Sequence, residues 1–218
     1  GVAIGPLIMV MMSSVVAGYS DYIVSRIEGL GQNLIVVSPR SGRTLTQNDL
    51  DKVRALEGVK LAEPFYATQG SVKVGGKDRT ITVFATSIDL VLSAISGLKI
   101  EDGSEPSPND IVGALVGYDI AFDDSGNQVY RVGDVITLTV YVPGKQGVSV
   151  RRINVVIRGI LGKFGGAFFL SPDTSVFLTT EAGRRLLGIN DWSGILVLAE
   201  STDLVPKLTK DLEDVYIG

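Results

Sequence analysis

The chain has 218 residues, of which 45% are hydrophobic and 20% charged, and it contains neither cysteine nor histidine. Without these two residue types it can form no disulfide, no Ser-His-Asp or Cys-His catalytic site and no zinc site with the usual nitrogen and sulfur ligands. Its net charge of −4 has the wrong sign for a protein that follows phosphate backbones, so we expect no nucleic acid partner.

The first twenty residues carry no charge, and every charged residue lies from Asp21 onward. A helix of about 20 residues rises about 30 Å, which is the thickness of the hydrocarbon core of a bilayer. A buried core helix is the alternative interpretation of such an apolar run. We favour the membrane, and expect residues 1–20 to be the end of a first transmembrane helix that begins upstream of Gly1.

An amphipathic pattern follows this apolar run. Hydrophobic residues recur at positions i, i+4, i+8 and i+11, where they are Tyr19, Ile23, Ile27 and Leu30. This spacing places them on one side of a helix. We therefore predict a candidate coupling helix that leaves the membrane and keeps one apolar stripe against a soluble domain.

The rest of the chain shows an α+β succession of elements. Runs of β-branched and alternating residues predict strands at 33–39, 59–74, 80–86, 111–116, 135–142, 148–160, 175–178 and 194–199. Apolar spacing and capping residues, such as Thr46 with Asp49, predict helices at 47–57, 88–95, 117–122, 181–187 and 203–215. Two mixed portions, 21–86 and 151–218, thus flank a β-rich portion, 87–150.

No motif for catalysis stands out. The three Gly-Lys pairs are followed by Asp, Gln and Phe, so the chain lacks the Gly-Lys-[Ser/Thr] of a phosphate-binding loop. Two carboxylate pairs, Glu101-Asp102 and Asp123-Asp124, lie among turn-forming residues, where acidic side chains favour backbone hydrogen bonds. We interpret them as solvated turns, and expect no catalytic residue, no metal site and no cofactor.

A loop rich in glycine and phenylalanine, residues 162–172, is the most distinctive local feature. It brings together the candidate partner or cargo contacts Phe164, Phe168, Phe169 and Leu170. Such an apolar loop can touch a partner subunit, a lipid-like cargo or the membrane surface. Alternatively, and this is the interpretation we favour, the phenylalanines fold back and cover the core.

The order of several short motifs resembles that in a known family. They include Val112-Gly-Ala-Leu-Val-Gly117 and Arg131-Val-Gly-Asp134, and the others lie at 1–5, 27–39, 45–51, 58–64, 156–161, 176–180 and 185–188. With this order, nearly the whole chain is similar to the extracytoplasmic core domain of MacB/FtsX-type ABC transporter permeases.

This resemblance implies a porter-like mixed α/β lobe, 21–86 with 151–218, and an inserted smaller β-rich lobe, 87–150. It implies a domain on the extracellular or periplasmic side of the cell membrane, in contact with membrane lipid, and a dimer of permease protomers. A cytoplasmic ABC ATPase would act through the membrane helices. The domain would couple ATP-driven helix movement to export or release of substrate without catalysing a reaction. The alternative is an FtsX-like anchored scaffold that recruits a partner such as a cell-wall hydrolase.

Overall fold

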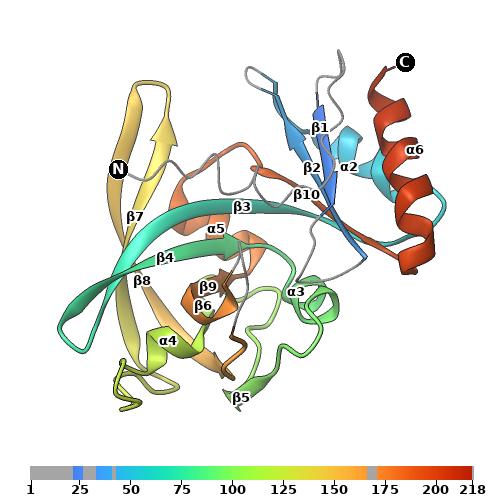
Figure 1. The fold of residues 1–218 in the computed structure, drawn as a ribbon. Coiled ribbons are helices and arrows are strands. Elements are labelled where there is room, and N and C mark those ends of the chain that lie inside the picture. Colours follow the sequence, from blue (N-terminus) through green and yellow to red (C-terminus); the bar gives the residue numbers. More distant parts are fainter. Residues whose placement is uncertain (1–21, 27–32, 41–42, 166–170, 218) are drawn as a thin grey trace. The chain divides into compact units, whose positions relative to one another are not determined.

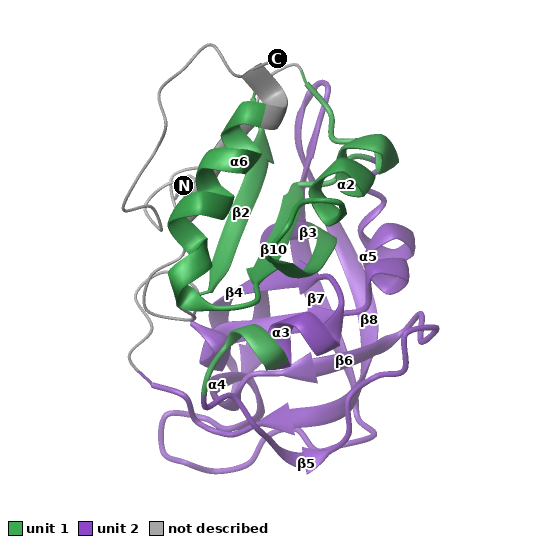
Figure 2. Ribbon diagram, turned by 90° about the vertical axis from the view of Figure 1, so that its right-hand side faces the viewer, with its two compact units in different colours: residues 1–65, 93–96, 191–218 green, residues 66–92, 97–190 purple. Residues whose placement is uncertain are grey.

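The chain forms two compact units in a computed structural model, which describes residues 22–26, 33–40, 43–165 and 171–217. Unit 1 comprises the described residues of 1–65, 93–96 and 191–218, and unit 2 comprises those of 66–92 and 97–190 (Figure 2). The chain passes between the units at four places. One of them lies inside a single strand, β3 (Val59–Val74).

Unit 1 contains an antiparallel sheet in the order β1-β2-β10-β3, to which β3 contributes its first residues (Figure 1). Its other strands are β1 (Tyr22–Arg26), β2 (Leu34–Pro39) and β10 (Gly194–Ala199). Its helices α2 (Gln47–Arg54) and α6 (Val205–Ile217) supply buried residues to the same core as the sheet. That core includes Ile35, Val37, Leu50, Val53, Ile195, Val197, Leu208 and Leu212.

The prediction of a coupling helix is wrong for residues 22–26, the part of it that the structure describes. Residues Tyr22–Arg26, Ile23 among them, form strand β1, which pairs antiparallel with β2 from Tyr22↔Pro39 to Arg26↔Ile35. Aromatic and β-branched residues favour strands, and the backbone pairing with β2 outweighs the local helical spacing. The predicted positions Tyr19, Ile27 and Leu30 and the predicted membrane segment 1–20 lie outside the described residues. No helix among the residues that the structure describes has the length and hydropathy of a membrane span.

Unit 2 is built around six strands that pair in a closed ring. The order is β3-β4-β9-β6-β8-β7, and β7 returns to β3. Strand β5 pairs with β8 outside the ring, and α3, α4 and α5 lie between strands in the sequence. The bounds are β4 (Lys77–Ala85), α3 (Ile88–Ala94), β5 (Ile100–Gly103), β6 (Gly113–Val116), α4 (Tyr118–Ala121), β7 (Val135–Gly144), β8 (Gly147–Leu161), β9 (Ser175–Leu178) and α5 (Thr180–Leu187).

Closure of this ring requires a glycine at position 70. Gln69, Gly70 and Ser71 of β3 pair with β7, and a Cβ atom at Gly70 would lie 2.3 Å from the carbonyl oxygen of Thr139. The Thr68 hydroxyl also donates a hydrogen bond to the Tyr141 carbonyl oxygen. A closed ring leaves none of the six strands with a free edge along its paired length. Fully buried side chains that share one face of the paired strands include Ile81, Ile136, Leu138 and Ile157.

The compact units have other boundaries than the predicted lobes, 21–86 with 151–218 and 87–150. The chain divides at 65/66, 92/93, 96/97 and 190/191. The predicted boundary at 150/151 falls inside β8, which pairs with β7 on both sides of that point. The assignment of one portion as a porter-like lobe remains a prediction.

Replacing Gly70 with Ala tests the closure of the ring. We expect Gly70→Ala to lower the free energy of unfolding by about 2 kcal/mol, since the added methyl group meets backbone atoms that cannot move alone. Thermal and urea unfolding of the 218-residue chain would measure this change. The matched control is Gly144→Ala in the β7–β8 turn, where an added Cβ approaches nothing closer than 3.4 Å. Equal stability of the two variants would contradict a requirement for glycine at position 70.

Candidate functional site

Helix α4 places two aromatic rings against each other at one end of β6. The helix begins after Gly117, whose amide donates to the Ser175 carbonyl oxygen over 2.9 Å. A Cβ atom at Gly117 would lie only 2.1 Å from the carbonyl oxygen of Pro172, so glycine allows this close approach. Tyr118 and Phe122 are four residues apart, and their rings stack with centroids 4.4 Å apart and planes 13° apart.

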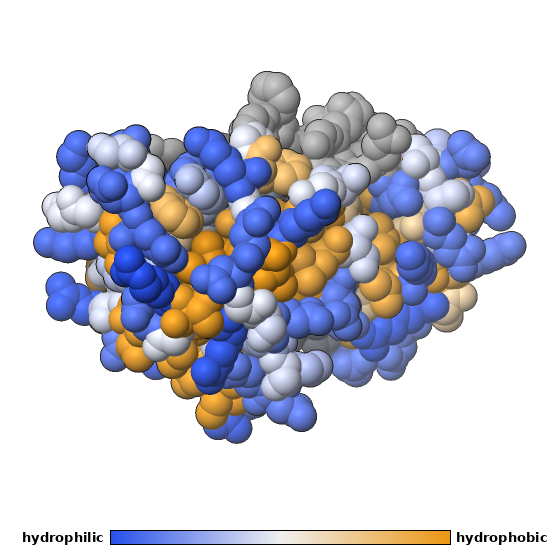
Figure 3. All heavy atoms as spheres, turned by 90° about the horizontal axis from the view of Figure 1, so that it is seen from below, coloured by the Kyte–Doolittle hydropathy of each residue, from blue (hydrophilic) through white to orange (hydrophobic). Residues whose placement is uncertain are grey.

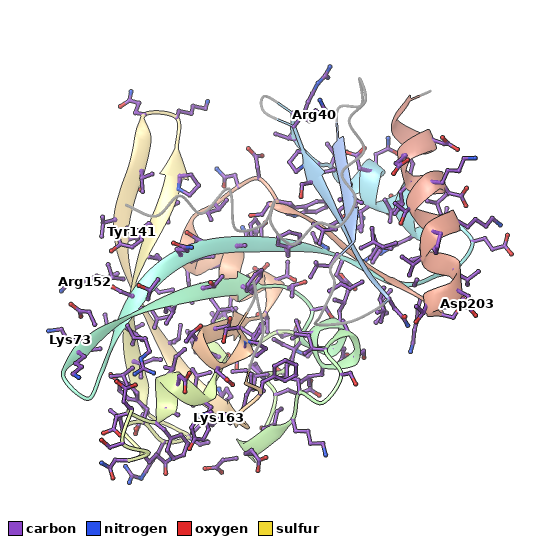
Figure 4. All side chains as sticks on the ribbon, in the orientation of Figure 1. Arg40, Lys73, Tyr141, Arg152, Lys163 and Asp203 are labelled. Carbon is purple, nitrogen blue, oxygen red and sulfur yellow. The ribbon has the colours of Figure 1, made fainter. Side chains whose placement is uncertain are left out.

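Lys163 lies over the tyrosine of this pair. It follows β8 by two residues, and the neighbouring Gly162 amide donates to the Lys99 carbonyl oxygen over 2.9 Å. The ammonium nitrogen of Lys163 lies 5.5 Å from the centroid of the Tyr118 ring. This distance is within the range of a cation–π interaction. Figure 4 labels Lys163 close to α4.

These residues line a cavity of about 330 Å³ in unit 2, which we call the α4 pocket. Strand β5 contributes two exposed carboxylates, and β8 contributes two buried aliphatic side chains as a wall. Gln128 is held opposite Phe122 by a β-bridge. The complete lining is Glu101, Asp102, Tyr118, Phe122, Gln128, Ile160, Leu161, Gly162 and Lys163. The face of the molecule that Figure 3 shows likewise has hydrophobic residues at the surface among hydrophilic ones.

A further carboxylate on α4 makes the surroundings of the pocket more acidic. Burial raises the pKa of Asp119 above its ordinary value, and the negative charge of Asp173 raises it further, against the opposing charges of Arg79 and Lys163. The Asp119 carbonyl oxygen accepts a 2.9 Å hydrogen bond from Arg79. Lys163 is thus the cation that acts both on the Tyr118 ring and on this carboxylate.

The glycine and phenylalanine loop is anchored by a buried carboxylate. Asp173 is only 4% exposed, and its two oxygens accept hydrogen bonds from the amides of Phe164 at 2.7 Å and Gly165 at 2.8 Å. Phe164 is half-buried. The other predicted contacts of this loop, Phe168, Phe169 and Leu170, lie outside the described residues. The roles of these three residues stay a prediction.

The two carboxylate pairs have different environments. Asp123 lies in a turn, where its Oδ1 atom accepts hydrogen bonds from the amides of Ser125 and Asn127, as the sequence predicts. Glu101 and Asp102 lie on β5 rather than in a turn, because this segment pairs with the end of β8. The pairing brings both carboxylates to the lining of the α4 pocket.

A second surface that sequence reasoning missed lies on the β7–β8 hairpin. Three hydrophobic residues project from the same face near its tip and are exposed: Tyr141 by 38%, Val148 by 69% and Val150 by 66%. Tyr141 pairs directly with Val150. We call these three residues the hairpin face. Figure 4 labels Tyr141 and also Arg152, which pairs with Thr139 on the same face.

The sequence contains signals for both sites that could have been recognised. The spacing of Tyr118 and Phe122 on a predicted short helix already implies that their rings meet. On the hairpin, Val148 and Val150 are hydrophobic where a strand with one solvated face normally carries polar residues. Lys163 could not be placed from sequence, since its position depends on where β8 ends relative to α4.

A family comparison identifies the class of protein to which this fold belongs. Residues 1–215 match the model of the MacB-like periplasmic core domain, and the chain belongs to this family. The family is one of ABC transporter permease domains on the periplasmic or extracellular side of membranes.

Individual relatives agree with this assignment. The chain is 22% identical over 223 residues to an uncharacterized ABC transporter permease of Methanocaldococcus jannaschii, covering 98% of this chain and 52% of that protein. It therefore spans about half the length of this relative. The periplasmic region of MacB from Actinobacillus actinomycetemcomitans has a similar fold, with a TM-score of 0.57, 14% identity and 86% coverage of each chain. The extracellular domain of the transporter YknZ from Gram-positive bacteria gives a TM-score of 0.54 with 17% identity, covering 79% of this chain and 82% of that one.

The role of Asp173 as the anchor of the loop can be tested by hydrogen exchange. In Asp173→Asn one carboxylate oxygen becomes an amide donor, so one of the two backbone hydrogen bonds is lost. We expect the amides of Phe164 and Gly165 to exchange at least about tenfold faster, because hydrogen bonds to a charged acceptor are worth more than neutral ones. The control variant is Asp203→Asn, at an exposed position of unit 1. Unchanged exchange at Phe164 and Gly165 would refute the anchor.

Proposed function

We propose that this chain is the extracytoplasmic domain of an ABC transporter permease, and that it couples ATP-driven movement of membrane helices to export or release of substrate outside the membrane. It performs no catalysis itself. The observation that carries this proposal is the family match over residues 1–215. The α/β fold, similar to that of the MacB periplasmic region, supports it.

The connections of unit 1 provide a physical route for such coupling. The first described strand, β1, and the last helix, α6, both belong to unit 1 and contact each other. Strand β1 is hydrogen-bonded to β2 over five residue pairs, and α6 also contacts β2. A displacement of either end of the domain therefore acts directly on the sheet of unit 1, whereas a flexible linker would absorb it.

The partners follow from the same proposal. The permease acts as a dimer in the cell membrane, with this domain on the extracellular or periplasmic side and residues 1–20 as the end of its first membrane helix. A cytoplasmic ABC ATPase, fused or separate, drives the membrane helices, and membrane lipid surrounds them. The predicted loop residues Phe164, Phe168, Phe169 and Leu170 are candidate contacts with a partner or cargo in this arrangement.

A flexible insertion immediately before β1 tests the coupling. A Gly-Gly-Ser insertion between residues 21 and 22 of the whole permease should leave ATP hydrolysis intact and reduce ATP-dependent transport by about tenfold or more, as expected when a coupling free energy is lost. The measurement compares ATPase and transport rates in reconstituted vesicles. The same insertion between Gly76 and Lys77 is the control, because a Cβ atom added at Gly76 would meet no atom within 4 Å. Full transport with the insertion before β1 would contradict transmission through this strand.

A second candidate function is that of an anchored scaffold which recruits an extracellular protein. The hairpin face favours it, since clustered exposed hydrophobic residues are typical of protein interaction sites. Recruitment and coupling are compatible, because a recruited protein can itself respond to movement of the domain.

Serine substitutions on the hairpin face separate recruitment from stability. We expect Val148→Ser with Val150→Ser to change the free energy of unfolding by less than about 1 kcal/mol, because both side chains are already exposed. If the face recruits a partner, transport by the whole permease should nevertheless fall severalfold. The control pair is Ser149→Ala with Arg151→Ala, on the opposite face of the same strand. Unchanged transport in the valine variant would exclude the scaffold function for this surface.

A further inference from the structure

We propose that the α4 pocket binds a small organic cation, an ammonium ion with an apolar body, and that Lys163 occupies the cation position until the ligand displaces it. The site is distinct from the coupling route through unit 1, since all residues of its lining lie in unit 2. Its volume of about 330 Å³ is at the lower end of the range for small-molecule sites.

The aromatic pair supplies the first part of the recognition. The face of an aromatic ring attracts cations, and the Lys163 ammonium group already lies 5.5 Å from the centre of the Tyr118 ring. This contact shows that the ring face is open to a cation and correctly oriented for one. Stacking against Phe122 fixes the orientation of the tyrosine. The exposed lysine side chain can leave this position at low cost, because its own ammonium group is well hydrated in water.

The charge balance of the lining supplies the second part. Glu101 and Asp102 contribute two carboxylates and Lys163 contributes one ammonium group. When the lysine moves out, the lining carries two carboxylates and two aromatic rings. A monovalent cation is then attracted by both kinds of group, whereas an anion is repelled.

The apolar part of the lining indicates an organic cation rather than a metal ion. Ile160 and Leu161 are buried side chains at the wall of the pocket. Ca²⁺ and Mg²⁺ require six or more oxygen ligands, which aliphatic and aromatic groups do not provide. An alkylammonium ion can place its methyl or methylene groups against Ile160 and Phe122 and its charge near Tyr118 and the carboxylates.

The experiment compares two probes of nearly equal shape. Choline carries a quaternary ammonium group, and 3,3-dimethylbutan-1-ol replaces its charged nitrogen with carbon. Titration of each into the 218-residue chain, followed by NMR at the amides of Tyr118, Phe122 and Lys163, should show choline binding about tenfold or more tightly than the alcohol.

Three variants identify the groups responsible. Lys163→Met should bind choline severalfold more tightly, since the internal competitor is removed. Tyr118→Leu should weaken choline about tenfold, whereas Tyr118→Phe, which retains the ring, should not. Glu101→Gln should weaken choline but leave the neutral alcohol unchanged. Phosphate serves as the anionic probe and should produce no shifts at these amides.

Several results would overturn the proposal. Equal affinity for choline and its neutral analogue would show an apolar pocket without cation recognition. Phosphate binding that disappears in Lys163→Met would show an anion site instead. Loss of choline binding in Lys163→Met would show that choline binding requires the lysine, and that the lysine does not compete with choline. Tyr118→Phe keeps the aromatic ring, and the comparison of the two probes uses the unchanged chain. Both tests therefore remain valid even if Tyr118→Leu does not fold.

Discussion

The pairing of β7 with β3 at Gly70 is the contact on which unit 2 depends. It joins the two ends of a six-stranded ring, and it is possible only because no side chain separates Gly70 from the Thr139 carbonyl oxygen. Once the ring is closed, the position of β8 is fixed between β7 and β6. The end of β8 then determines where β5 pairs, and it places Lys163 beside the Tyr118 ring of α4. The α4 pocket is therefore positioned by a strand of this ring.

The sequence predicted most elements but not how they pair. Strands β9 and β10 match the predicted ranges 175–178 and 194–199, and Thr46 with Asp49 forms the predicted capping box. These features depend on neighbouring residues alone. The ring was not predicted, because β3 and β7 are far apart in sequence and a glycine inside a strand does not reveal its partner. The same limit explains the helix predicted around Ile23, where pairing with β2 decides the conformation.

The two units suggest a division of roles. In unit 1, the first described strand and the last helix contact each other, which suits the proposed transmission of movement from the membrane. Unit 2 is a closed ring with an exposed hairpin face and a mixed pocket, which suits recognition outside the membrane. Continuity of β3 from one unit to the other provides a backbone connection between these roles.

The central claim is that this domain moves with the nucleotide state of the transporter. The 218 residues contain no cysteine, so a cysteine introduced for a spin label has no competing thiol within them. We would place one label at Asp203 of unit 1 in each protomer of the whole permease and measure their separation by pulsed electron paramagnetic resonance, with and without ATP. We expect the distance distribution to shift on ATP binding, while a label pair at Lys73 and Gln146 within unit 2 stays unchanged. Identical distributions at Asp203 in both nucleotide states would contradict coupling through this domain.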